Sequence, residues 1–253
     1  MKECEIFSNL NVPYGSKIVI RIDGRNFSNL SKVLELERPY DEDFANLMLD
    51  VCSDFFIEFS PHFIFTFSDE INILLSEVPF NGRIEKLDSV FASFIAGSFT
   101  KNLMEHTNIL NKIDPKDLKP VSFDSRVIPL YGDGVLDYFK NRQDEAWRNC
   151  LNGYSYWKLR EEYDKSRAVE ILNKKKSSEL HEILFERGLN LAEMPAWQRR
   201  GIGLYKKTIP ITGYNPINSE RVVSNRLRVY TDWELPLLNE DFFKSNSIKL
   251  TNH

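Results

Sequence analysis

The pattern of apolar and polar positions over residues 17–75 predicts a strand, a helix and two further strands. Residues 17–22 contain a β-branched run, 18–22, that is interrupted only by Arg21 and has turn signals on both sides, as is typical of a strand. Residues 41–59 carry apolar side chains at spacings of three and four, which indicates one buried helical face: Phe44, Leu47, Met48, Val51, Cys52, Phe55 and Phe56. Two apolar runs flank Ser68-Asp69-Glu70, which predicts antiparallel strands joined by an acidic turn.

The same pattern predicts a helix over 83–103 and a strand over 121–130. The order βαββαβ is the split-βαβ, ferredoxin-like arrangement, so we predict an α+β fold with helices on one face of an antiparallel sheet. Residues 135–157 and the charged segment 160–182 are predicted helical, and the last seventy residues are predicted to form short strands and loops. We therefore expect a catalytic domain over 1–135 and a C-terminal extension over 136–253 packed on it.

Composition narrows the function classes. A chain of 253 residues with 42% apolar residues can bury one large core, and a net charge of −4 gives no global reason to bind nucleic acid, so such binding requires local basic patches. Three widely spaced cysteines match no metal-ligand or redox spacing, which favours reduced thiols in the cytoplasm. The longest apolar stretch, residues 90–99, is too short to span a bilayer, and we expect no membrane partner.

The acids occupy informative positions. In the βαββ topology the end of the first strand and the turn between the second and third strands lie at one edge of the sheet, so Asp23 and Asp69-Glu70 are expected to converge. Neighbouring carboxylates repel unless a cation lies between them, and Mg²⁺ is commonly held by one or two carboxylates plus phosphates. Gly24 permits close approach of backbone to a metal or a triphosphate. Taken singly, each motif is also compatible with an ordinary turn.

The residues resemble a known family. RIDGRNFSNL, the Arg38-Pro39-Tyr40-Asp41 stretch and FSDE are similar to the tRNA-histidine guanylyltransferase family and its Thg1-like relatives, as are Phe123-Asp124-Ser125-Arg126-Val127 and the Arg142-Gln143 region. The resemblance implies a polymerase palm-like fold that adds nucleotides in the 3′-to-5′ direction at the 5′ end of tRNA. The 5′ phosphate is first activated with ATP or GTP, and the 3′-hydroxyl of an incoming nucleotide then attacks it.

The resemblance also implies site residues and partners. Two Mg²⁺ ions would be held by Asp23, Asp69 and the Gly24 carbonyl, with Glu70 supporting the site. The nucleotide would be bound by Asp23, Gly24, Arg25, Asn26, Phe27, Ser28, Ser68 and Asp69, with Arg38 and Lys86 on its phosphates. Contacts to tRNA are expected from Arg142, Asn149, Asn190, Arg199, Arg200 and Lys206. The expected partners are tRNA, GTP and ATP, and the expected assembly is a homotetramer, a dimer of dimers.

One stretch departs from the family pattern. Eukaryotic members carry His-Ile-Asn-Asn-Leu-Tyr-Asn where this chain has Trp147-Arg148-Asn149-Cys150-Leu151-Asn152-Gly153. Replacement of the histidine by Trp147 favours a Thg1-like enzyme that repairs 5′ ends by pairing with the opposite strand. Trp147 itself either stacks on a base or belongs to the core.

Two alternatives use the same residues differently. A nucleotide cyclase would keep the sheet and both acids but has no need of the long C-terminal half. A non-catalytic RNA-binding module would stack bases on Phe63, Phe65 and Phe67, but has no use for converging carboxylates.

Overall fold

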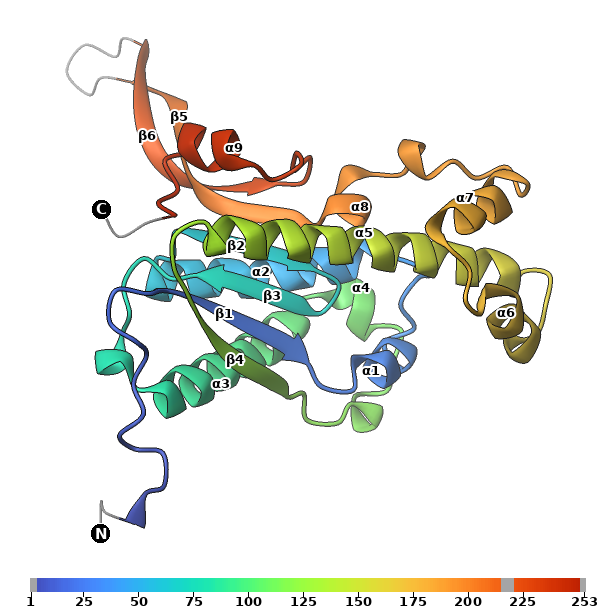
Figure 1. Ribbon diagram of the computed structural model, residues 1–253, viewed down its shortest axis with the longest axis horizontal. Coiled ribbons are helices and arrows are strands. Elements are labelled where there is room, and N and C mark those ends of the chain that lie inside the picture. The colour runs from blue at the N-terminus through green and yellow to red at the C-terminus, as the bar shows by residue number, and fades with distance from the viewer. Residues whose placement is uncertain (1–3, 215–220, 251–253) are drawn as a thin grey trace.

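One antiparallel sheet, with strand order β4-β1-β3-β2-β5-β6, organises the molecule (Figure 1). The computed structural model describes residues 4–214 and 221–250, and the following statements concern those residues. The first four strands in the chain have the β4-β1-β3-β2 order of a ferredoxin-like sheet, which confirms the α+β, palm-like prediction. Their bounds are β1 (Lys17–Gly24), β2 (Phe63–Phe67), β3 (Glu70–Leu74) and β4 (Phe123–Leu130).

Two helices cover one face of this sheet, as the spacing of apolar residues predicts. They are α2 (Glu42–Phe59) and α3 (Ile84–Leu103). Ile18, Ile20 and Ile22 of β1 point toward them and join the same buried cluster. The Asp41 carboxylate caps α2 by accepting a 2.8 Å hydrogen bond from the Phe44 backbone N–H, so α2 begins at a fixed point beside the sheet.

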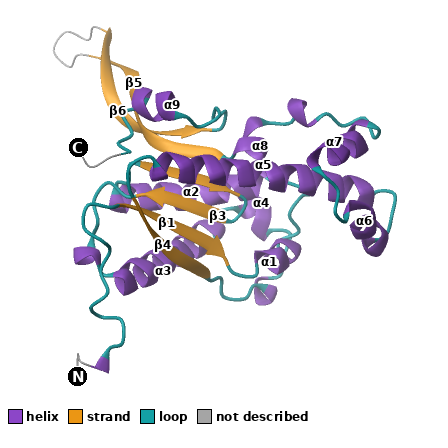
Figure 2. Cartoon of the chain, viewed as in Figure 1, coloured by secondary structure: helices purple, strands orange, loops and turns teal. Residues whose placement is uncertain are grey.

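The second face is also covered, although the sequence predicts helices on one face only. The long helix α5 (Gly134–Arg160) crosses it, and α9 (Glu240–Ser245) packs beside β5 (Figure 2). Phe63 contacts Phe139 and Phe243 with ring centroids 5.1 and 5.4 Å apart. Phe63 and Phe65 are completely buried, so they form no exposed platform for RNA bases. The expectation of helices on one face only was wrong because alternate residues of β2 are apolar on both faces.

The two C-terminal strands are long rather than short. They are β5 (Ile202–Tyr214) and β6 (Arg221–Asp232). β5 pairs with β2 only over Ile202–Tyr205, and the rest of the β5–β6 ribbon extends beyond the sheet (Figure 1). Pro210 lies within β5, but a two-stranded ribbon has open edges, where proline is tolerated. β5 belongs to the same sheet as β1–β4, so strands from both sides of the proposed 135/136 boundary share one sheet. The division into two domains at this position stays a prediction.

The remaining helices are short, and three of them, α6, α7 and α8, pack against α5. The C-terminal part of α5 extends past the sheet and carries α6 and α7 (Figure 1), so the predicted helical segment 160–182 is two helices with a break. None of the helices described here is long and apolar enough to cross a bilayer. The bounds are α1 (Phe27–Val33), α4 (Thr107–Leu110), α6 (Lys165–Leu172), α7 (Ser177–Phe185) and α8 (Ala196–Arg200), with 3₁₀ turns η2 (Phe80–Gly82), η3 (Pro115–Asp117) and η4 (Leu191–Glu193).

Candidate functional site

The end of β1 and the β2–β3 turn meet, as the topology predicts. The Gly24 backbone N–H donates a 3.3 Å hydrogen bond to the Asp69 carbonyl, and Asp23 lies opposite Glu70 in the β1–β3 register. Asp23 lies opposite Asp124 on its other side, in β4. Residues 46 positions apart are thus held together by backbone hydrogen bonds of a buried sheet.

The two aspartates are electrostatically strained. Burial, together with the nearby Glu70 and Asp124 carboxylates, raises the pKa of Asp23 to about 6, while Arg21 opposes the shift. The Arg21 Nε lies 3.2 Å and the Arg126 guanidinium 3.6 Å from the Asp23 Oδ2. Burial also raises the pKa of Asp69, against hydrogen bonds from its own backbone and from the Ser68 hydroxyl at 3.1 Å, and Asp23 adds to the rise. A divalent cation between the two side chains would relieve this strain.

The raised pKa of Asp23 predicts how the stability of the protein depends on pH. Because the folded protein favours the protonated carboxyl, this group's stabilising contribution is complete below about pH 4 and is lost as the pH rises through about 6. Without divalent cations at pH 7.5, Asp23→Asn is therefore expected to unfold at a higher temperature than the parent. Its free energy of unfolding should be about 2 kcal/mol larger. The gain should disappear near pH 4 in calorimetric scans. Equal melting temperatures at pH 7.5, or a difference that does not change with pH, would contradict the strain.

Glu70 is held by a network beneath α5. Its two carboxylate oxygens accept hydrogen bonds from Arg142 Nε and Nη2 at 2.8 and 2.7 Å, and Asn72 Nδ2 donates to it at 2.8 Å. The Tyr138 hydroxyl in turn donates to Asn72 Oδ1 at 2.6 Å. The Glu70 and Arg142 side chains are 10% and 17% exposed, so this is a largely buried, bidentate ion pair. Arg142, expected to contact tRNA, is instead committed to Glu70 and lies over the Phe67 ring.

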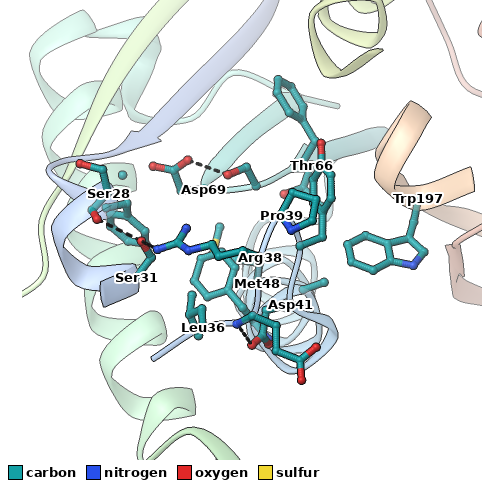
Figure 3. Close-up of a pocket in the computed structure, with 18 of the residues that line it drawn as sticks. Ser28, Ser31, Leu36, Arg38, Pro39, Asp41, Met48, Thr66, Asp69 and Trp197 are labelled. Carbon is teal, nitrogen blue, oxygen red and sulfur yellow. Dashed lines mark hydrogen bonds between the residues drawn. The ribbon is translucent and has the colours of Figure 1, made fainter. Parts of the chain in front are cut away.

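A cavity of about 490 Å³ opens beside Asp69 (Figure 3), and its lining includes Gly24 but not the neighbouring Asp23. Figure 3 shows Asp69 at one side of the cavity and Leu36 with Asp41 at the other, with Arg38 between them. The Asp69 side is polar, with Gly24, Asn26, Ser28 and Ser68, whereas Leu36, Phe44, Met48 and Trp197 contribute apolar surface. Arg38 Nη2 donates a 2.6 Å hydrogen bond to Ser31 Oγ. This volume and mixture of surfaces suit a nucleotide with its phosphates toward Asp69.

The turn between β1 and α1 requires glycine at its first position. A Cβ on Gly24 would lie 2.3 Å from the Phe27 ring, which is buried against Phe99 and Phe123. Asn26 follows in the left-handed region with φ 61°. One side of this turn thus packs against the aromatic core, and the other side lines the cavity.

Several expected site residues lie elsewhere. Arg25 faces away from the cavity, into a separate small pocket. Lys86 is exposed near the start of α3, where the backbones of residues 82–84 bond to residues 10–12, just before β1 begins. The aspartates lie at the opposite end of β1, so Lys86 does not line the cavity in this chain.

The residues proposed for tRNA contact are scattered over the C-terminal half. Asn149 is exposed on α5, Asn190 accepts a hydrogen bond from the Ala192 N–H, and Lys206 is exposed on β5. Arg199 and Arg200 end α8, the helix whose Trp197 lines the cavity, and Arg199 Nε donates to the Met194 carbonyl. Trp147 is half-buried and stacks on His181 of α7 with ring centroids 5.7 Å apart, so it belongs to the α5–α7 contact.

Sequence reasoning missed the far wall of the cavity. Trp197 packs edge-on against Tyr40 and Trp233, and Thr66 and Met48 complete the lining. Trp197 lies in a short helix that has no recognisable motif. No local signal places it within the site, since it is about 130 residues from the strand it packs beside.

The sheet order, the two aspartates at adjoining strand ends and the cavity beside them define a palm of the nucleotidyltransferase class. Residues 1–131 match the family described as Thg1: tRNAHis guanylyltransferase. The chain is 31% identical to the tRNA(His) guanylyltransferase of Saccharomyces cerevisiae, over 73% of this chain and 80% of the yeast protein. The chain therefore belongs to the tRNA(His) guanylyltransferase family.

Other relatives extend this comparison. Identity with tRNA(His) guanylyltransferase 1 of Arabidopsis thaliana is 31%, covering 90% of this chain, but the chain spans only 40% of that protein's length. A bacterial Thg1-like protein solved in complex with ATP superposes with a TM-score of 0.76 at 23% identity, covering 99% of this chain and 98% of that one. The crystal structure of the S. cerevisiae enzyme superposes with a TM-score of 0.70 at 26% identity, covering 79% and 90%. These superpositions confirm the palm-like fold.

Proposed function

We propose that the protein is a 3′-to-5′ nucleotidyltransferase that adds nucleotides to the 5′ end of tRNA. The observation that carries this proposal is the strained Asp23 and Asp69 pair beside a nucleotide-sized cavity in a member of this family. In the first step an oxygen of the tRNA 5′ phosphate attacks the α-phosphorus of ATP or GTP and pyrophosphate leaves. In the second step the 3′-hydroxyl of the incoming nucleotide attacks the activated 5′ phosphate, and the nucleoside monophosphate leaves.

The residues present fit a magnesium site. No three His, Cys, Asp or Glu side chains gather as ligands in residues 4–214 and 221–250, so protein ligation would rest on Asp23, Asp69 and the Gly24 carbonyl. Two carboxylates that leave room for waters and phosphates are the usual Mg²⁺ arrangement. Two bound Mg²⁺ ions would stabilise the attacking and leaving oxygens of the transfer.

The remaining cavity residues have distinct roles in the proposal. The Arg38 guanidinium, already bonded to Ser31, is placed to bind phosphate oxygens, and Asn26, Ser28 and Ser68 add polar donors near Asp69. The apolar surface of Leu36, Met48 and Trp197 accommodates the base. Glu70 acts through Arg142, Asn72 and the neighbouring Asp23, and so positions the site without touching substrate.

We further propose that the substrates are damaged or truncated tRNAs as well as tRNA-histidine, because Trp147 stands at the position of the family's histidine and packs on His181. The decisive assay supplies full-length and 5′-truncated tRNAs with labelled ATP, GTP, CTP or UTP. Template-dependent repair predicts that the added base follows the opposing one in each tRNA. Absence of any 5′ addition would refute the proposal, and conversion of GTP alone to a cyclic product would favour the cyclase alternative.

The β5–β6 ribbon supports a proposal that the protein self-associates as a homotetramer. Its outer half exposes apolar side chains that no other described element covers: Tyr214, Val222, Val223, Leu227 and Val229. By the β5–β6 register Tyr214, Val223, Leu227 and Val229 lie on one face of the ribbon, and such an apolar patch is uncommon on a monomer. Light scattering coupled to chromatography would detect the tetramer, and a monomer at all concentrations would contradict it.

The free cysteines Cys4, Cys52 and Cys150 support a cytoplasmic location.

A further inference from the structure

A second, smaller pocket lies behind the turn that forms the cavity wall. It has a volume of about 70 Å³ and is lined by Arg25, Asn26, Asn29, Leu30, Val33, Asp117, Lys119, Pro120 and Val121. Asn26 lines both spaces, so the turn from Gly24 to Ser28 separates them. A space of this size is too small for a nucleoside, because sites for such ligands are about 300 Å³ or larger. It does match a single phosphate group.

The pocket carries unpaired positive charge. Within residues 4–214 and 221–250 the side chains of Arg25 and Lys119 take part in no ion pair or hydrogen bond, and both are exposed. Asp117 lines the same pocket but pairs with neither cation. The amides of Asn26 and Asn29 add neutral donors. Two free cations and two amides around a small space are the chemistry that binds a phosphate oxygen cluster.

The pocket is also close to the reacting groups. Arg25 follows Asp23 by two residues, a stretch of chain that spans at most about 7 Å. The Arg25 backbone N–H donates a 2.9 Å hydrogen bond to the Ser122 carbonyl, which fixes the turn to the connection that carries Lys119. A nucleic acid whose 5′ end reaches Asp23 can therefore place a phosphate near Arg25 and Lys119.

We propose that this pocket, the Arg25–Lys119 pocket, binds a phosphate of the RNA substrate near its 5′ end, while the larger cavity binds the nucleoside triphosphate. This inference rests on the proposed function and assigns Arg25 to RNA rather than to the nucleotide. The occupant is either the terminal 5′ phosphate or a backbone phosphate close to it, and both present negatively charged non-bridging oxygens.

The test compares Arg25→Ala and Lys119→Ala with Lys112→Ala, a variant of an exposed lysine on the same connection that lines neither pocket. Binding of a tRNA lacking its first nucleotide is measured over a range of salt concentrations, with ATP and GTP binding measured separately. Removing either pocket cation should weaken RNA binding about 5- to 10-fold and lower the salt slope by about 1. Triphosphate binding should change less than about twofold, and Lys112→Ala should resemble the parent in both measurements.

The same variants distinguish the two phosphates and separate this inference from the proposed function. With RNA carrying a 5′-hydroxyl, disappearance of the loss identifies the terminal phosphate, and persistence identifies the backbone. The inference is overturned if both pocket variants bind RNA as Lys112→Ala does, or if they lose triphosphate binding as strongly as RNA binding. If the parent adds no nucleotide to any tRNA but binds RNA through Arg25 and Lys119, the proposed function fails and the pocket stands.

Discussion

Asp69→Asn is expected to reduce nucleotide addition to the 5′ end of tRNA by about a thousandfold or more. Asp69 supplies one of the two carboxylates proposed to hold Mg²⁺ where β1 meets the β2–β3 turn, and an amide carries no charge to hold a divalent cation. A thousandfold loss corresponds to about 4 kcal/mol of transition-state stabilisation, within what metal-ion catalysis supplies. Single-turnover assays with a 5′-truncated tRNA and saturating triphosphate would measure it.

The matched control for this prediction is Asp137→Asn, which removes an exposed carboxylate from α5. Its activity should stay within about twofold of the parent, because a surface charge away from the site is screened by solvent. Asp69→Asn should still bind tRNA, since the Arg25–Lys119 pocket does not include Asp69. An Asp69→Asn protein that folds normally and retains a tenth or more of the activity would exclude Asp69 as a metal ligand.

Arg142→Ala is expected to destabilise the protein by about 3 kcal/mol. It would leave the Glu70 carboxylate largely buried, without its bidentate partner and beside Asp23. Removing one member of a buried pair typically costs 3–5 kcal/mol, and the slight exposure of this pair places the loss at the lower end. For a chain of this size, the melting temperature should fall by about 6–12 °C.

Two further variants isolate the cause of that loss. Arg148→Ala breaks the exposed Arg148–Glu145 pair on the same helix and should cost no more than about 1 kcal/mol. Adding Glu70→Gln to Arg142→Ala removes the unpaired charge and should recover much of the stability. If the double variant is no more stable than Arg142→Ala, the loss comes from packing of the arginine over Phe67 and not from a stranded carboxylate.

The folded position of Lys86 lies away from the cavity, although the family resemblance predicts a phosphate contact for this residue. The helix α3 was predicted within one residue, and its resemblance to the family put a phosphate contact on Lys86. The chain reaches α3 only after β3 has run from Glu70 to the far end of the sheet, so α3 begins there. The predicted strand order already places the start of α3 and the end of β1 at opposite ends of the sheet, and so it separates Lys86 from Asp23 within one chain.

The sequence by itself determined the order of β1, α2, β2, β3, α3 and β4, the antiparallel arrangement of the four strands and the meeting of Asp23 with the β2–β3 turn. These features follow from the spacing of apolar residues within each segment and from the short connections between segments, and both can be recognised from residues close together in the sequence. Only the tertiary structure decided that α5 covers the second face, that Arg142 pairs with Glu70 and that Trp197 closes the cavity. Those contacts join residues 70 or more positions apart, and the path of α5 and β5 across the sheet selects them through packing that leaves no local pattern.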